Sequence, residues 1–190
     1  MIEYELPYES FIGGWFISEK TCDDVIDYFN RIKDKLGKPG RLGYGIDKKK
    51  KDSLDVGVHQ MNFEGPIKSY REQLQKCLDN YEKRYGYVHH LDNFNINTSY
   101  AIQYYKPGGG FKEWHCERPN SKMEKRCLVF MTYLNNVDEG GTEFYHQKII
   151  TPAKKGLTLI WPTDWTHTHK GQISKTQEKF IVTGWYSFTP

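Results

Sequence analysis

The most specific chemistry in the sequence lies in the pair His115 and Glu117. In an extended strand, residues i and i+2 point to the same side, so this imidazole and this carboxylate would face one point. Such a pair is half of a metal site or an acid–base pair. A third ligand is available in residues 165–171, which contain His167 and His169. If that segment is extended, the two histidines share a face and either one completes the set.

Two histidines and one carboxylate hold Fe(II) in non-haem oxygenases and leave three coordination positions open. A 2-oxo acid can occupy two of these positions, and dioxygen can occupy the third. The far carboxylate of the 2-oxo acid then needs a fixed cation and a hydroxyl donor. Lys179 begins an otherwise apolar terminal strand and suits the cation role, and a strand tyrosine can supply the hydroxyl.

These residues lie in the second half of the chain, where strand patterns follow one another closely. Runs of β-branched and aromatic residues between Gly, Pro and Asn turns are typical of strands. The predicted strands are residues 96–105, 127–134, 142–145, 157–161 and 179–188. Many short strands of this kind favour a sandwich or a barrel-like jelly roll.

The first half of the chain shows helical periodicity instead. Residues 21–36 carry an apolar stripe with Thr21 as the N-cap, and Gly37 ends the helix. Residues 66–85 carry a second stripe that begins with Pro66, a residue favoured at the first helical position. We expect an α+β, mainly β fold: a double-stranded β-helix, or jelly roll, with the N-terminal helices packed on one sheet.

The length predicts a single domain over residues 1–190. Within it, residues 1–90 would form a helical N-terminal support region, and residues 91–190 the jelly-roll catalytic core. The chain has 27 Lys plus Arg against 24 Asp plus Glu, a formal net charge of +3. This balance argues against nucleic acid as the partner. The run Lys48 to Lys51 is interpreted as a solvated loop tip, because no aromatic residues interleave it.

The sequence shows no sign of export or membrane insertion. No segment has the roughly 20 mostly apolar residues of a membrane span, and the N-terminus is acidic, unlike a signal peptide. The 4 cysteines show no CxxC spacing, so without an export signal we expect reduced thiols. We therefore expect a cytoplasmic protein with no membrane partner.

Several motifs follow one another in a fixed order in the second half. They are a tyrosine and Gly-rich turn, the His-x-Glu pair, a strand ending Tyr-Leu-Asn, a Gly-Gly turn leading to Phe, an apolar strand ended by proline, a His-x-Gly, and a basic residue ten positions later. The matching segments are Tyr104 to Phe111, Trp114 to Glu117, Tyr133 to Asn135, Gly140 to Phe144, Gly156 to Pro162, His169 to Gly171, and Lys179. This order resembles the Fe(II)- and 2-oxoglutarate-dependent dioxygenase superfamily, in particular its prolyl 4-hydroxylase-like branch.

The resemblance implies a role for each site residue. His115, Glu117 and His169 would be the iron ligands, and the His-x-Gly match with its distance to Lys179 favours His169 over His167. Lys179 would pair with the C5 carboxylate of 2-oxoglutarate.

Two tyrosines complete the site that the resemblance implies. Tyr133 would donate a hydrogen bond to the same carboxylate, and Tyr105 would line the pocket, with the adjacent Tyr104 as the alternative. Most relatives carry Asp where this chain has Glu117. Glutamate still supplies an anionic oxygen, so we expect iron binding, and its presence argues against halogenation, which needs a small residue there.

The resemblance implies a hydroxylase that uses Fe(II), 2-oxoglutarate and O2, with ascorbate as a reductant. It would hydroxylate an unactivated C–H bond of a small molecule or of a peptide or protein, for instance at a prolyl residue, and release succinate and CO2. Residues 117–126, which include Arg118 and Arg126, form either a substrate-facing lid or a plain surface loop. The alternative function is a non-catalytic cupin-like jelly-roll module that binds a metal or a sugar.

Overall fold

The protein is described by a computed structural model that covers residues 1–42 and 45–189. Its helices are α1 (Glu19–Leu36) and α2 (Gly65–Arg84), and short 3-10 turns occupy Tyr8–Ser10, Gly86–His90, Ser121–Met123 and Trp165–His167. The strands are β1 (Ile2–Glu3), β2 (Gly13–Phe16), β3 (Lys38–Pro39), β4 (Lys51–Asp52), β5 (Leu54–Val58), β6 (Phe94–Asn95), β7 (Tyr100–Tyr105), β8 (Gly110–Phe111), β9 (Arg126–Tyr133), β10 (Val137–Phe144), β11 (Ile149–Ala153), β12 (Leu157–Pro162), β13 (His169–Gly171) and β14 (Lys179–Phe188).

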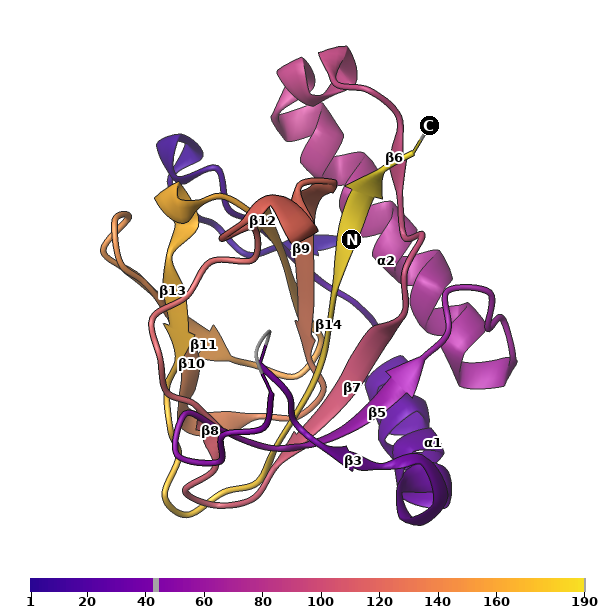
Figure 1. Ribbon diagram of the computed structural model, residues 1–190. Helices are drawn as coiled ribbons and strands as arrows, with labels where there is room; N and C mark the ends of the chain where they lie inside the picture. The colour runs from indigo at the N-terminus through magenta and orange to yellow at the C-terminus, as the bar shows by residue number, and fades with distance from the viewer. Residues whose placement is uncertain (43–44, 190) are drawn as a thin grey trace.

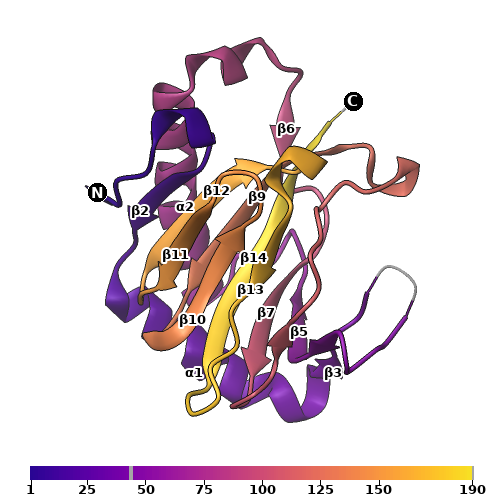
Figure 2. The same cartoon turned by 90° about the vertical axis from the view of Figure 1, so that its left-hand side faces the viewer.

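Two antiparallel sheets form the body of the molecule (Figures 1 and 2). In the described part of the chain, the large sheet has nine strands in the order β1-β2-β12-β9-β14-β7-β5-β3, with β6 paired to β14. The small sheet has the order β11-β10-β13, and β4 pairs with β8 apart from both. The mainly β jelly-roll architecture with two helices on one sheet is therefore confirmed.

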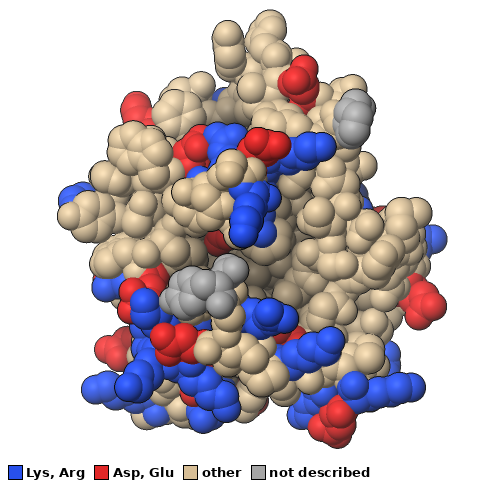
Figure 3. Space-filling view, viewed as in Figure 1, with Lys and Arg blue, Asp and Glu red and all other residues tan. Residues whose placement is uncertain are grey.

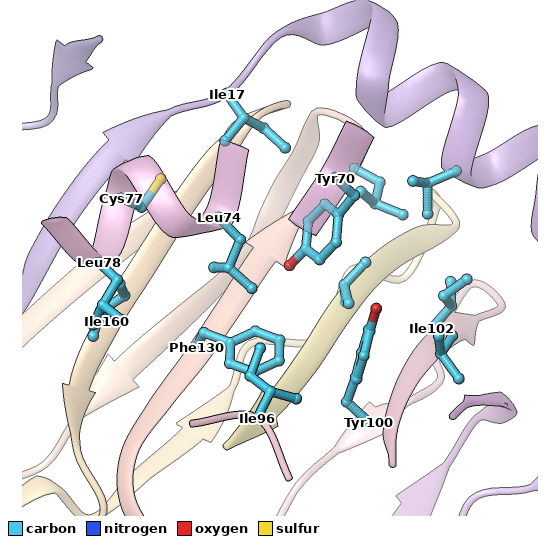
Figure 4. Packing of buried hydrophobic residues seen from close by; sticks show 14 of the residues in the cluster. Ile17, Tyr70, Leu74, Cys77, Leu78, Ile96, Tyr100, Ile102, Phe130 and Ile160 are labelled. Atoms are coloured by element: carbon cyan, nitrogen blue, oxygen red, sulfur yellow. The ribbon is translucent and has the colours of Figure 1, made fainter. Parts of the chain in front are cut away.

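Both helices cover the face of the large sheet that points away from the small sheet (Figure 1). The predicted stripe of α2 is buried there: Tyr70, Leu74 and Tyr81 are each at most 1% exposed. Figure 4 shows Tyr70 and Leu74 pointing from α2 toward Phe130 of the sheet. Burying such a side chain stabilises the fold by roughly 1.5–3 kcal/mol, so packing rather than helix propensity holds α2 in place.

The structure corrects two local predictions. Helix α1 begins at Glu19 after Ser18, so Thr21 is not the N-cap; it is buried inside the helix, where its hydroxyl accepts a hydrogen bond from Gln73. The predicted strand over residues 96–105 begins only at Tyr100.

The description of residues 1–90 as helical is incomplete, because β1, β2, β3 and β5 of the large sheet come from this region. Strands β2 and β5 contain glycine and are short, which weakened their strand signal. Among the described residues, neither helix is long and apolar enough to cross a membrane.

Candidate metal centre

A cavity of about 700 Å³ lies between the two sheets and opens on the face that is hollowed in Figure 3. Strand β14 shows how the fold divides side chains between this cavity and the helix-side core. Its odd-numbered residues from 179 to 185 line the cavity, whereas Phe180, Val182 and Tyr186 pack beneath the helices. The two sets alternate because successive strand residues point to opposite faces of a sheet.

His115, Glu117 and His169 meet at one point of the cavity wall, with their donor atoms all within 4.8 Å of one another. Glu117 Oε1 lies 3.5 Å from His115 Nε2 and 3.6 Å from His169 Nε2. The backbone brings the two histidines together: His115 N donates to His169 O at 3.0 Å, and His169 N donates to His115 O at 2.8 Å. The predicted strand is not formed here, because His115 makes only an isolated bridge and Glu117 follows in a bend, but the carboxylate still faces the two histidines.

Both histidine rings are held with one nitrogen free. His115 Nδ1 lies 2.8 Å from the carbonyl oxygen of Glu113, and His169 Nδ1 lies 2.8 Å from that of His167. A carbonyl oxygen only accepts, so both Nδ1 atoms must carry a proton, and in the neutral rings the Nε2 lone pairs point at the shared site. This tautomer is the one that a metal-binding imidazole needs, with its second nitrogen tied to an outer partner.

His167 lies outside this cluster. The prediction that it shares a strand face with His169 required an extended segment, but Trp165–His167 is a 3-10 turn. Its Nε2 instead lies 2.9 Å from the carbonyl oxygen of Ser10. Burial lowers the pKa of His167, which keeps it neutral in this structural contact. The geometry therefore brings His169, not His167, to Glu117.

The two oxygens of Glu117 have different partners. Oε1 faces the two histidines, and Oε2 accepts a hydrogen bond from Trp185 Nε1 at 2.9 Å. The guanidinium of Arg126 lies over the Trp185 ring, 3.5 Å from its centroid, and approaches Oε2 at 3.6 Å. Burial alone would raise the pKa of Glu117, but hydrogen bonding and charge interaction with His115 and His169 hold it well below its usual range. Glu117 is therefore an ionised carboxylate with one oxygen directed at the site.

Lys179 is a buried cation without an acidic partner among the described residues. It is 6% exposed, and Nζ donates to the carbonyl oxygens of Gly140 at 2.8 Å and Gln172 at 2.9 Å. An ammonium group has three protons to donate, so one remains for a ligand in the cavity. Burial lowers the pKa of Lys179 to about 8. A carboxylate bound beside Nζ would offset that cost, because an opposite charge favours the charged form.

Tyr133 and Tyr105 line the cavity, whereas Tyr104 does not. Tyr104 points to the other side of β7, with its ring centroid 4.9 Å from that of Phe180. Tyr133 Oη lies 2.6 Å from Thr142 Oγ1, and burial raises the pKa of Tyr133 to about 12, so it stays a protonated donor.

Tyr105 belongs to a hydrogen-bonded chain that sequence analysis missed. Its hydroxyl donates to Gln103 Oε1 at 2.7 Å, and Gln103 Nε2 donates to Asp55 Oδ2 at 3.2 Å. Lys51 Nζ is 2.9 Å from the same Asp55 oxygen. The Tyr105 proton is thus committed to Gln103, and its oxygen can only accept from a ligand.

Residues 119–123 of the predicted lid line the cavity, but Arg118 does not. The Arg118 guanidinium donates to Asp164 Oδ1 through two nitrogens, Nε at 3.0 Å and Nη2 at 2.6 Å. Arg126 Nη1 donates to the Glu117 carbonyl oxygen at 2.7 Å. Both arginines therefore anchor the base of the loop, and Arg118 does not face the cavity, whereas residues 119–123 do.

Trp185 is the main site residue that sequence analysis did not find. A signal was present, because Trp185 follows Lys179 by six positions, and an even separation places both side chains on one face of a strand. Its bond to Glu117, 68 positions away in the sequence, depends on the pairing of strands and not on any local pattern.

The donor set fits a mononuclear iron site. Two neutral imidazole nitrogens and one carboxylate oxygen converge on one side, and the cavity opens on the other, which is the arrangement of the two-histidine, one-carboxylate class. Lys179 is buried and has no acidic partner in the described part of the chain, so it fits the distal carboxylate of a 2-oxo acid. The fold and the site thus define a jelly-roll protein with a candidate metal centre and a separate buried lysine that could hold an anion.

The sequence pattern of the 2OG-Fe(II) oxygenase superfamily matches residues 77–187, more than half of the chain. The chain belongs to this superfamily of enzymes, and Fe(II) and 2-oxoglutarate are the cofactor and co-substrate that the family and the His-Glu-His cluster imply. No curated protein sequence matches the chain significantly.

Solved structures share the fold at low sequence identity. A prolyl-4-hydroxylase from Pseudomonas putida has a TM-score of 0.70 at 13% identity, over 94% of this chain and 93% of that one. A viral collagen prolyl hydroxylase from Paramecium bursaria Chlorella virus-1 has a TM-score of 0.69 at 20% identity, over 94% of this chain and 97% of that one. A prolyl hydroxylase from Trichoplax adhaerens, in complex with a hypoxia inducible factor peptide fragment, has a TM-score of 0.72 at 18% identity, over 94% and 84%.

Proposed function

We propose that this oxygenase hydroxylates an unactivated C–H bond in a peptide or protein, with a prolyl residue as the first candidate. Its cavity of about 700 Å³ supports this proposal, because it lies in the upper part of the roughly 300–1,000 Å³ range of small-molecule sites. It has room for the co-substrate and for part of a second molecule. The structurally similar prolyl hydroxylases, one of them bound to a peptide fragment, support a peptide as that molecule.

The same proposal assigns roles to the site residues. His115, Glu117 and His169 would hold Fe(II), and Lys179 with Tyr133 would hold the C5 carboxylate of 2-oxoglutarate. When bound, Fe(II) and 2-oxoglutarate activate dioxygen, with release of succinate and CO2, and supply the oxidising power for hydroxylation. The protein orients both molecules, ties Nδ1 of each histidine to a backbone carbonyl so that Nε2 faces the site, and shields the site with Trp161 and Met131, which are 1% and 7% exposed.

The observation that carries this function is the combination, in one cavity, of one oxygen of Glu117, two fixed Nε2 atoms and a buried Lys179 that has no ion pair with any described residue. A cupin-like module that only holds a metal has no need for a buried cation at the far end. An oxygenase with an anionic co-substrate does need one.

The decisive experiment has two measurements. Adding Fe(II) and 2-oxoglutarate without oxygen should produce a weak visible charge-transfer band. Adding oxygen with a panel of prolyl peptides should then release succinate and raise the mass of one peptide by one oxygen atom. His115→Ala should lose both signals. His89→Ala, which changes an exposed histidine outside the cavity, is the matched control and should retain them.

The two measurements fail separately. Absence of the visible band in the unchanged protein would contradict the assigned iron and 2-oxoglutarate residues. A normal band with succinate release but no oxygen in any peptide, and oxygen found in small metabolites instead, would contradict a peptide substrate.

A further inference from the structure

The side chains that line the cavity differ strongly in charge. Among the described residues, the lining contains the basic side chains of Arg41, Lys51, Lys122, Arg126 and Lys179, whereas Glu117 is the only acidic one. The net charge of +3 for the whole chain does not reveal this concentration. Figure 3 shows Lys and Arg side chains around the central hollow.

Three of these five cations already have a task. Lys179 faces the position assigned to the co-substrate, Arg126 contacts Glu117 and Trp185, and Lys51 is paired with Asp55 at 2.9 Å. Arg41 and Lys122 remain, and both are exposed. Neither forms an ion pair with any acidic residue that the structure describes.

Arg41 and Lys122 come from two different rims of the cavity. Lys122 lies in the turn Ser121–Met123 of the loop anchored by Arg118 and Arg126, whereas Arg41 follows β3 on the large sheet. A ligand that enters between the rims would therefore meet a cation on each side.

The four-lysine run extends this basic region. It was interpreted as a solvated loop tip, and Lys48 and Lys49 are indeed exposed, but the run folds back against the segment that leads to His115. Lys112 N donates to Lys50 O at 2.8 Å, and Lys51 pairs with Phe111 between β4 and β8. The run therefore adjoins the cavity wall, and Lys112 adds a further exposed cation beside it.

We infer that the mouth of this cavity selects acidic peptide segments, with carboxylates on both sides of the residue that is hydroxylated. This inference rests on the proposed function and names its substrate class. Two cations on opposite rims would each meet a carboxylate of an extended peptide, and the surrounding lysines would raise the local concentration of such a peptide. Charge complementarity of this kind governs specificity and association rate more than total affinity.

The arrangement favours a peptide over a nucleic acid. Single-stranded nucleic acids bind in basic grooves that follow many phosphates, with aromatic side chains on which successive bases stack. Here the cations surround a single cavity, and the two aromatic rings beside them are already in contact with other side chains. Trp114 contacts Tyr145 at a centroid distance of 5.2 Å and has Lys170 Nζ 4.4 Å from its centroid, and Phe111 stacks on His115 at a centroid distance of 3.7 Å. That ring contact leaves no open face toward His115 for a base.

The test uses three labelled peptides with a central Ala-Pro-Ala flanked on both sides by two Asp, two Asn or two Lys residues. Binding is measured by fluorescence anisotropy on the full chain with 2-oxoglutarate and with Mn(II) in place of iron. We expect the Asp peptide to bind at least about tenfold more tightly than the Asn peptide at low salt, with the Lys peptide weakest. The difference should shrink at about 0.5 M salt, because screening weakens interactions between exposed charges.

Two double variants test which cations act. Arg41→Gln with Lys122→Gln should reduce the preference for the Asp peptide to less than about threefold. Lys35→Gln with Lys83→Gln removes the same charge from exposed helix positions on the far side of the large sheet, and should leave it unchanged.

Equal binding of the three peptides, or an equal loss with both double variants, would overturn the inference. Tighter binding of a ten-nucleotide oligo-dT than of the Asp peptide, lost in Arg41→Gln with Lys122→Gln, would also overturn it in favour of nucleic acid. Oxygen transfer into peptides, measured by mass spectrometry with iron present, tests the proposed function separately. Transfer without charge preference would leave the function intact and reject the substrate class.

Discussion

The two faces of the large sheet use the same strands for opposite purposes. On the helix side, Phe130 and Val182 of the sheet pack with residues of the helices such as Tyr70 in an apolar core. On the cavity side, the neighbouring positions of the same strands carry groups such as Lys179 and Tyr133, whose polar atoms are buried but directed at a shared space. One face gains stability from apolar burial, and the other carries buried polar groups for which a ligand is the natural partner.

In the central strands, the residues that face the cavity carry the function, and the residues that alternate with them face the helices and stabilise the fold. Each strand contributes to both faces. A mutation at one position should therefore affect mainly stability, and a mutation at the next position mainly activity. We therefore expect mutations on the cavity side to lower activity with little change in melting temperature, and mutations on the helix side to do the reverse. The effects below run from the largest expected to the smallest.

Glu117→Ala should show the largest effect on activity with little loss of stability. It removes the only carboxylate of the cluster, so succinate release should fall by more than the roughly 10- to 100-fold that outer-sphere partners of a metal cost. The melting temperature should change little, because the deletion removes a buried charge rather than apolar packing. A loss of cooperative unfolding in this variant would contradict the division between the two faces.

Phe130→Ala should show the reverse pattern. Phe130 is fully buried and its ring contacts Tyr100 and Tyr186 at centroid distances of 5.6 and 5.4 Å. Truncation of a buried phenylalanine costs about 3–5 kcal/mol, which lowers Tm by roughly 6–20 °C in a chain of this size. Activity measured well below Tm should be nearly retained, and a selective loss of 2-oxoglutarate binding would break the comparison.

Lys179→Ala should raise the KM for 2-oxoglutarate at least roughly 30-fold, because losing one partner of a buried charge pair costs about 2 kcal/mol or more. Iron binding in the absence of 2-oxoglutarate should be unchanged, which a metal titration can check. A Lys83→Ala variant, on the exposed side of α2, is the control. An unchanged KM would show that the anion site lies elsewhere.

Trp185→Phe should weaken Fe(II) binding by about 10- to 100-fold, because it removes the donor that holds Glu117 Oε2. The longer glutamate depends on this bond to keep one oxygen directed at the histidines. In a Glu117→Asp background the same change should cost less, since the shorter side chain is drawn away from the indole. Trp15→Phe in the helix-side core is the control, and an equal effect of both tryptophan changes would argue for packing alone.

The KM for 2-oxoglutarate should stay constant below about pH 8 and rise above it. Burial lowers the pKa of Lys179 to about 8, so above that pH the free protein loses the charge that binds a carboxylate. The bound carboxylate favours the charged form and raises this pKa in the complex, so affinity falls between the two values by up to about tenfold per pH unit. Lys179→Arg remains charged, and its profile should be flat; a flat profile in the unchanged protein would contradict the assignment.

Much of the site could be predicted from local sequence. The spacing of two between His115 and Glu117 predicted that both side chains face one point, and they do, although His115 forms only an isolated β-bridge and Glu117 lies in a bend. The apolar stripe of residues 66–85 predicted α2 to within one residue at each end, because helix periodicity is a local property. The terminal strand matched at both ends, from Lys179 to Phe188.

Other choices needed the arrangement of distant segments. Tyr104 and Tyr105 are equivalent as sequence, and only the position of the helices decides which of them faces the cavity. His167 ends a 3-10 turn instead of lying in the strand that begins at His169, and the polar segment around it did not reveal this turn.

The sequence by itself determined the class of chemistry, the helices and the alternating faces of the main strands, because these depend on residue types and on short, regular spacing. Only the tertiary structure decided that Trp185 and Arg126 hold the second oxygen of Glu117, and that a lysine run near residue 50 lies beside a metal centre. These contacts join segments far apart in the chain. Their geometry is set by strand pairing and by loop closure, and no local pattern records it.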